Sequence, residues 1–213
     1  MIKAIIFDYD ETLVKTLDSR IQAYIKLAIL KYNFILSEEK IRKAFGLPYE
    51  VFIKSLFGEV DSVENIIKNY QELVPQFPNV AYGGALEIIN KLLLLKYPVG
   101  IVSGSRKNMM INDMTRLNFP IDRFFYIQSG EDTQVHKPDP KVFEPLFSKL
   151  KEINVIPEEV LHIGDDLRDH EAATKAGMQS VVICNHTTTK EQLENVEANY
   201  INSFEELESI LQN

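Results

Sequence analysis

The chain has 213 residues, of which 45% are hydrophobic and 25% are charged, so it can bury the core of one large domain or of two small ones. Its formal net charge of −8 opposes a general affinity for nucleic acid or for an anionic membrane, because no basic stripe offsets that charge. A single cysteine excludes an intrachain disulfide, and no apolar run approaches the roughly 20 residues that span a bilayer. We therefore expect a cytoplasmic protein without a nucleic-acid or membrane partner.

The first predicted strand, residues 3–7, is a short apolar run that stops abruptly at acidic residues. From about residue 16 to residue 77 there is no strand pattern. Helical patterns there cover residues 17–32, 38–45, 49–57 and 63–73. A single crossover connection needs far fewer residues than this. We therefore predict a helical subdomain, 16–77, inserted into an α/β core formed by 1–15 and 78–213.

Beyond the insertion, helix and strand patterns alternate along the chain. Helical periodicity is found over 85–95, 108–117, 140–150 and 166–176, and a capping box at Ser203 to Glu206 opens a last helix. Strand patterns lie at 99–102, 124–128, 160–163 and 180–183. The strand runs are continuously apolar, which indicates a sheet covered on both faces. This alternation predicts an α/β fold with a doubly wound, Rossmann-like parallel sheet and right-handed crossovers.

Polar residues follow four of these segments, where the carboxyl ends of parallel strands meet at one edge of a sheet. They are Asp8, Asp10 and Thr12 after the first strand, Ser103 and Gly104 after the second, Lys137 near the end of the third unit, and Asp165, Asp166 and Asp169 after the fourth. We expect these residues to converge on one rim.

Such a set of residues fits a phosphoryl-transfer site. Carboxylates that meet at one point repel each other, and a hard divalent cation with oxygen ligands relieves that repulsion, which favours Mg²⁺. Asp8 is suited to act as the nucleophile that forms an aspartyl phosphate, and Asp10 as the acid and then the base. Ser103 and the N–H groups that follow it, from Gly104 onward, are placed to hold a phosphoryl oxygen, and Lys137 supplies positive charge.

The order of these motifs resembles the motif order of a known family. The series Asp8-Tyr-Asp10-Glu-Thr12, Ser103, Lys137-Pro138 and Gly164-Asp165-Asp166-x-x-Asp169 resembles the four ordered motifs of the haloacid dehalogenase superfamily. The segments 136–140 and 172–178 are similar to its phosphoglycolate phosphatase and β-phosphoglucomutase branch, and the helical insertion resembles the helical cap of that branch. This resemblance covers essentially the whole chain.

The resemblance implies a ligand set and a division of roles. It makes Asp8 the nucleophile and a metal ligand, Asp10 the acid/base with its backbone carbonyl on the metal, and Asp165 the third protein ligand. Dehalogenases lack the second aspartate of the first motif, so the presence of Asp10 favours phosphate chemistry.

The remaining motif positions have supporting roles in the family. The resemblance implies that Thr12 steadies the loop that carries Asp10, and that Asp169 acts through water or Lys137. Asp166 is a candidate for the same outer layer, but capping of the following helix explains it equally well. Ser105 fits a phosphate contact and a helix start equally well. Glu11 stands where a glycine is commonest in the family.

These inferences predict a Mg²⁺-dependent phosphatase, a phosphoric monoester hydrolase that acts on a small phosphorylated metabolite through an aspartyl phosphate. The alternative within the same chemistry is a phosphomutase of the β-phosphoglucomutase type. The alternative of another class is a receiver-like or non-catalytic phosphoacceptor domain. Receiver domains have a shorter chain than this one and carry the phosphorylated aspartate on a middle strand. Here the candidate aspartate follows the first strand, and both differences disfavour that alternative. We expect a monomer or a weak homodimer whose cap closes over substrate on hinges at 15–19 and 77–83.

Overall fold

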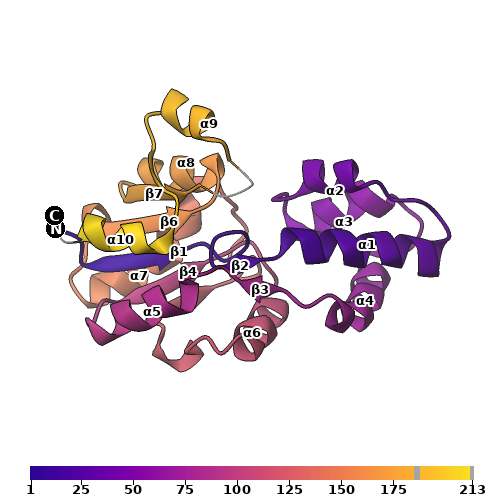
Figure 1. The fold of residues 1–213 in the computed structure, drawn as a ribbon, viewed down its shortest axis with the longest axis horizontal. Coiled ribbons are helices and arrows are strands. Elements are labelled where there is room, and N and C mark those ends of the chain that lie inside the picture. The colour runs from indigo at the N-terminus through magenta and orange to yellow at the C-terminus, as the bar shows by residue number, and fades with distance from the viewer. Residues whose placement is uncertain (185–187, 212–213) are drawn as a thin grey trace. The chain divides into compact units, whose positions relative to one another are not determined.

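Six parallel strands form the main sheet of this protein, in the order β5-β4-β1-β6-β7-β8 (Figure 1). Their bounds are Ala4–Phe7 for β1, Val99–Val102 for β4, Tyr126–Gln128 for β5, Val160–Gly164 for β6, Gln179–Ile183 for β7 and Asn199–Ile201 for β8. The structure is a computed structural model that describes residues 1–184 and 188–211. The observed sheet confirms the predicted doubly wound α/β fold.

The described residues form two units. Met1–Val14 and Ala81–Asn213 make up the core unit, which contains the six-stranded sheet, and Lys15–Val80 make up the helical unit. The two chain segments that connect the units are β2 (Val14–Lys15) and β3 (Val80–Ala81), which pair with each other as a two-stranded sheet. No described helix is long and apolar enough to cross a membrane.

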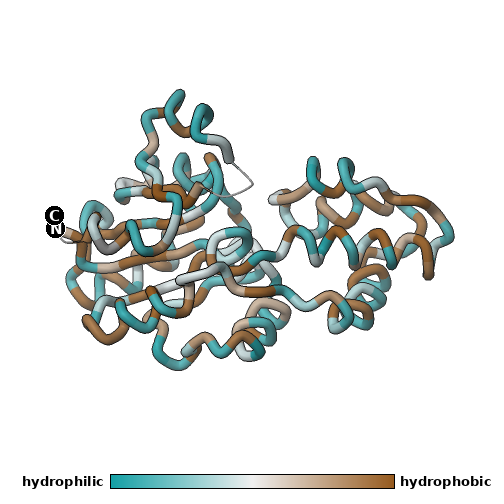
Figure 2. The backbone as a smooth tube through the Cα atoms, in the orientation of Figure 1, coloured by the Kyte–Doolittle hydropathy of each residue, from teal (hydrophilic) through white to brown (hydrophobic). Residues whose placement is uncertain are grey.

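The central strands of the main sheet are buried because helices cover both of its faces. Every residue of β1, β4 and β6 is buried, as their continuously apolar sequences predict. The hydropathy colouring of Figure 2 shows apolar segments gathered in the strands at the centre of the core unit. β8 was not predicted, because only the last of its three residues is buried and its sequence therefore carries little hydrophobic signal.

Alternation along β1 divides the core into two layers. Ile5 and Phe7 face a cluster that includes Ile89 of α5 (Ala85–Leu94) and Phe204 of α10 (Phe204–Leu211). Ala4 and Ile6 face the opposite cluster, with side chains from η3 (Pro140–Phe143), α7 (Glu144–Glu152) and α8 (Leu167–Lys175). Because successive side chains of a strand point to opposite faces, these four residues join both layers.

The helices of the core unit follow the predicted periodicity with two differences. The predicted helix 140–150 begins as the 3₁₀ turn η3, and the α-helix starts only at Glu144, because Pro145 in its first turn has no N–H to donate. The short helix α9 (Lys190–Asn195) was not predicted. The helix α6 (Lys107–Arg116) lies where it was expected, and α8 stops before Gly177, whose φ of 81° is the left-handed conformation predicted there.

Four α-helices make up most of the helical unit. They are α1 (Leu17–Tyr32), α2 (Glu38–Ala44), α3 (Tyr49–Phe57) and α4 (Val63–Leu73), and the 3₁₀ turn η1 (Val74–Gln76) follows them. Ser37 and Ser62 cap α2 and α4 by accepting N–H groups of the first turn. The core is aromatic: Tyr24 stacks on Tyr70 with ring centroids 4.1 Å apart and contacts the edge of Phe52.

Two positions on α5 provide a test of this packing. Ile89 is fully buried and Leu94 of the same helix is 75% exposed. We expect Ile89→Ala to lower the free energy of unfolding by about 2–5 kcal/mol, because it removes transfer energy and leaves a cavity. We expect Leu94→Ala to change it by no more than about 0.5 kcal/mol. Urea denaturation followed by circular dichroism measures both, and equal losses would contradict the assigned faces of α5.

Candidate functional site

The first site residue lies directly beyond the central strand β1. The N–H of Asp8 donates to the carbonyl of Ile163 in β6, with 2.8 Å between nitrogen and oxygen, so the backbone at Asp8 is still held by the sheet. The residue is 8% exposed. Asp8 is therefore fixed at the carboxyl edge of the sheet, where ligands bind in open α/β folds.

A tight turn follows Asp8 and carries Asp10. The N–H groups of Leu13 and Val14 both donate to the carbonyl of Tyr9, and Glu11 has a φ of 57°. A positive φ favours glycine, which explains why glycine suits this position. Here the buried carboxylate of Glu11 accepts a hydrogen bond of 2.8 Å from the hydroxyl of Tyr82, and this contact accommodates the side chain.

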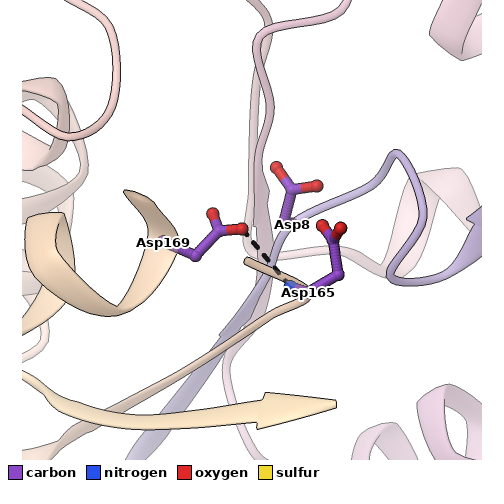
Figure 3. Close-up of side chains that lie close together, drawn as sticks. All are labelled: Asp8, Asp165 and Asp169. Carbon is purple, nitrogen blue, oxygen red and sulfur yellow. Dashed lines mark hydrogen bonds between the residues drawn. The ribbon is translucent and has the colours of Figure 1, made fainter. Parts of the chain in front are cut away.

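The loop after β6 places three aspartates with different tasks. Asp166 caps α8 by accepting the N–H groups of Arg168 and Asp169, which is the capping role that the sequence left open beside a functional one. Asp169 returns its carboxylate to the loop, where Oδ2 accepts the N–H of Asp165 at 3.3 Å (Figure 3). The same oxygen accepts the N–H of Asp166 at 3.4 Å. The hydroxyl of Thr12 donates to Oδ1 of Asp165 at 3.2 Å, so the turn after β1 is tied to the loop after β6.

Lys137 joins two of the carboxylates. Its Nζ donates to Oδ1 of Asp8 at 2.7 Å and to Oδ1 of Asp169 at 2.5 Å, and its side chain is 12% exposed. Carboxylate oxygens of Asp8, Asp165 and Asp169 all lie within 4.8 Å of one another, and the three side chains gather at one point in Figure 3. Three buried carboxylates and one ammonium therefore share one small space, and their oxygens are the ligands that hard divalent cations take.

Burial and neighbouring charges shift the pKa values of this cluster. Burial raises the pKa of Asp8, the Lys137 ammonium opposes that change, and the Asp169 and Asp10 carboxylates reinforce it, so the pKa of Asp8 rises to about 8. Burial lowers the pKa of Lys137, but the carboxylates of Asp169 and Asp8 outweigh it and hold that pKa above its usual value. Lys137 is therefore charged at neutral pH, and a further positive charge near Asp8 would favour the ionised form of its carboxyl.

A second group of contacts lies in the loop between β4 and α6. The N–H of Ser103 donates to the carbonyl of Gln128, and the Oγ of Ser103 accepts the N–H of Ser105, both at 3.0 Å. The hydroxyl of Ser105 donates to Oδ2 of Asp10 at 2.5 Å. No described atom lies within 4 Å of a methyl group added at Gly104. This loop therefore borders the turn that carries Asp10.

Two sets of hydrogen bonds link the predicted site residues. Asp8, Thr12, Lys137, Asp165 and Asp169 are linked around the three carboxylates, whereas Asp10 bonds Ser105 and through it the Ser103 loop. In the described part of the chain, the carboxylates whose oxygens lie within 4.8 Å of one another are those of Asp8, Asp165 and Asp169. The ligand role of the Asp10 backbone carbonyl stays a prediction. The sequence offered Ser105 only as a phosphate contact or a helix start, and its bond to Asp10 was not predicted.

Comparisons with known proteins identify the family of this chain. The family model described as haloacid dehalogenase-like hydrolase matches residues 5–183. The chain belongs to this family. The match spans the strand that leads to Asp8, the Ser103 loop, Lys137 and the loop after β6, so it includes every predicted site residue.

Three individual proteins illustrate the similarity. The pyrophosphatase PpaX of Bacillus mycoides is 25% identical over 85% of this chain and 83% of its own length. The N-acetylmuramic acid 6-phosphate phosphatase of Pseudomonas aeruginosa is 25% identical over 85% of this chain and 81% of its own. A crystal structure of β-phosphoglucomutase from Clostridium difficile has a TM-score of 0.74 at 22% identity, covering 98% of this chain and 96% of that one. These findings confirm the predicted class, a haloacid dehalogenase-like phosphoric monoester hydrolase.

A glycine beside the carboxylates provides a test of the packing at the site. A methyl group at Gly164 would lie 2.4 Å from Cβ and from Cγ of Asp169. We expect Gly164→Ala to lower the free energy of unfolding by about 1–3 kcal/mol, because Asp169 has to move out of a buried position. Gly104→Ala, where the methyl meets no described atom within 4 Å, is the matched control and should stay within about 0.5 kcal/mol of the wild type. Denaturant melts that show no difference between the two variants would contradict this packing.

Proposed function

We propose that this chain is a Mg²⁺-dependent phosphatase that hydrolyses a small phosphorylated metabolite through an aspartyl phosphate on Asp8. The observation that carries the proposal is the buried contact of Lys137 with Asp8 and Asp169, beside Asp165. A carboxylate that is only structural does not need two further carboxylates with oxygens within 4.8 Å, because their repulsion costs stability. A site that binds an anionic phosphoryl group together with a cation does need them.

The donor set fits Mg²⁺. The close oxygens belong to carboxylates, and Mg²⁺ prefers such hard ligands together with water and phosphate oxygens. In this proposal Asp8, Asp165 and the backbone carbonyl of Asp10 hold the ion, while Asp169 holds Lys137. When bound, the ion supplies positive charge that keeps Asp8 ionised and offsets the charge of the phosphate.

The side chains of this site then have complementary roles. A carboxylate oxygen of Asp8 attacks phosphorus as the bond to the leaving oxygen breaks, and Asp10 gives its proton to that oxygen. Water next attacks the aspartyl phosphate, Asp10 takes a proton from this water, and phosphate leaves with Asp8 restored. Lys137 stabilises the charge that develops on the transferring group, and Ser103 with the N–H of Gly104 holds a phosphoryl oxygen.

The names of the relatives support a small phosphorylated substrate. One relative is named for pyrophosphate and another for a sugar phosphate, N-acetylmuramic acid 6-phosphate. The similarity to β-phosphoglucomutase is a similarity of fold, and a mutase would differ in passing the phosphoryl group to a sugar hydroxyl instead of water. Water is the acceptor in our proposal, and the helical unit serves as the cap that controls access to it.

The nucleophile is tested by Asp8→Asn. We expect this variant to release no phosphate above background from a panel of small phosphate monoesters, because the amide cannot attack phosphorus, while its unfolding transition is retained. Wild-type release should also stop when EDTA removes Mg²⁺. Asp122→Asn, an exposed aspartate of the core unit, is the matched control and should keep full activity. Normal turnover by Asp8→Asn would exclude covalent catalysis at this position.

The acid/base is tested by Asp10→Asn with two leaving groups. We expect kcat/KM to fall by about 10²–10⁴-fold for an alkyl phosphate, which is the usual contribution of general acid–base catalysis. The loss for p-nitrophenyl phosphate should be smaller, because p-nitrophenolate leaves without a proton. Steady-state assays of both substrates measure this difference. Equal losses for the two substrates would argue against an acid role for Asp10.

A further inference from the structure

We infer that Ser105 is a positioning residue for Asp10, holding the acid/base carboxyl in its working orientation. The inference rests on the proposed function, because it gives Asp10 the role assigned there. The Oγ of Ser105 donates to Oδ2 of Asp10 at 2.5 Å, and Ser105 is 6% exposed. A buried hydroxyl that donates to a carboxylate makes a charge-assisted hydrogen bond, which is stronger than a bond between neutral groups.

The backbone fixes Ser105 independently of Asp10. Its N–H donates to Oγ of Ser103, and its carbonyl accepts the N–H of Gly130 at 2.9 Å. Gly130 in turn packs against the same loop, since a methyl group there would lie 2.4 Å from the carbonyl oxygen of Gly104. The hydroxyl of Ser105 is thus an anchored donor to a carboxylate that the tight turn after β1 carries.

Helix capping does not account for the Ser105 hydroxyl. A serine at the start of a helix commonly accepts N–H groups of the first turn. In the described residues, however, the N-cap of α6 is Arg106, whose side chain makes no capping bond. The first-turn N–H of Lys107 donates instead to the carboxylate of Glu131 at 2.8 Å. Glu131 therefore performs the capping task, and the Ser105 hydroxyl is directed to Asp10.

This contact gives the two oxygens of Asp10 different tasks. Because Oδ2 accepts the hydrogen bond from Ser105, we assign to Oδ1 the proton that Asp10 gives and takes in the proposed mechanism. In the first step this proton passes from Oδ1 to the leaving oxygen as its bond to phosphorus breaks. In the second step Oδ1 takes a proton from the attacking water. Ser105 keeps its own proton throughout and acts only by orienting the carboxyl group.

The experiment is a double-mutant cycle of Ser105→Ala and Asp10→Asn. The substrate is phenyl phosphate, whose leaving group departs more easily than an alkoxide and less easily than p-nitrophenolate. Turnover by Asp10→Asn therefore remains measurable. We expect Ser105→Ala alone to lower kcat by about tenfold, the value of one charge-assisted hydrogen bond, with KM within about twofold of the wild type. In the Asp10→Asn background, Ser105→Ala should lower kcat by less than about twofold, because a positioning residue loses its effect with its target.

Two further variants separate positioning from a general loss of packing. Ser105→Thr keeps the hydroxyl and should restore kcat to within about threefold of the wild type. Ser180→Ala is the matched control: Ser180 is also 6% exposed, and its hydroxyl has no hydrogen-bond partner among the described residues. It should leave kcat unchanged. A tenfold loss of kcat that persists undiminished in the Asp10→Asn background would overturn the inference.

A crystallographic measurement makes the outcome independent of activity. In the crystal structure of Ser105→Ala, the Asp10 carboxyl should adopt a side-chain torsion different from that of the wild type, whereas Ser105→Thr should retain the wild-type torsion. An unchanged torsion in Ser105→Ala would overturn the inference. If the wild type released no phosphate from any monoester, the proposed function would fail, and the torsions would still decide whether Ser105 positions Asp10.

Discussion

The contact of Lys137 with Asp8 and Asp169 is the interaction on which the rest of the site depends. Burying three carboxylates together is unfavourable, and the ammonium offsets part of that cost with bonds of 2.7 and 2.5 Å. It also joins three distant parts of the chain, because Asp8 follows β1, Asp169 belongs to α8 and Lys137 precedes η3. The remaining excess of negative charge is the physical reason for the cation in the proposed mechanism.

The proposed catalytic groups differ in how they are held. Asp8 follows directly from a central strand of the sheet, and backbone N–H groups hold Asp169. Asp10 instead lies in a turn in which Glu11 has a positive φ, and its carboxyl is oriented by a contact with another loop. A nucleophile has to stay at one place, whereas an acid/base serves two oxygens in turn. The hydrogen bond from Ser105 orients the carboxyl of Asp10 for that second task in our proposal.

Membership in the haloacid dehalogenase-like hydrolases accounts for the shared framework of this site. The family match runs through all four motifs, and the fold of a solved β-phosphoglucomutase covers nearly the whole chain. At Glu11 the chain departs from the glycine that suits a positive φ, and the hydroxyl of Tyr82 makes up for the departure. A contact that lies outside the motifs themselves thus holds the side chain of Glu11.

Local patterns in the sequence determined most of the secondary structure and the identity of the main site residues. The bounds of α1, α3, α4 and β4 agree with the periodicity, because these elements bury one clear apolar face or a continuous apolar run. Asp8, Lys137 and Asp165 were recognisable because each belongs to a motif in a fixed order. β8 was not, because two of its three side chains are not buried and packing alone makes it a strand.

Only the tertiary structure decided which partner each side chain takes. Ser105 and Asp10 are 95 positions apart and Lys137 and Asp8 are 129 apart, so no local pattern relates them. The same holds for Asp166, whose two possible roles were equivalent in the sequence until the helix start showed it capping α8. Residue types and their order determine what chemistry is available, and the packing of the loops against one another determines which groups meet.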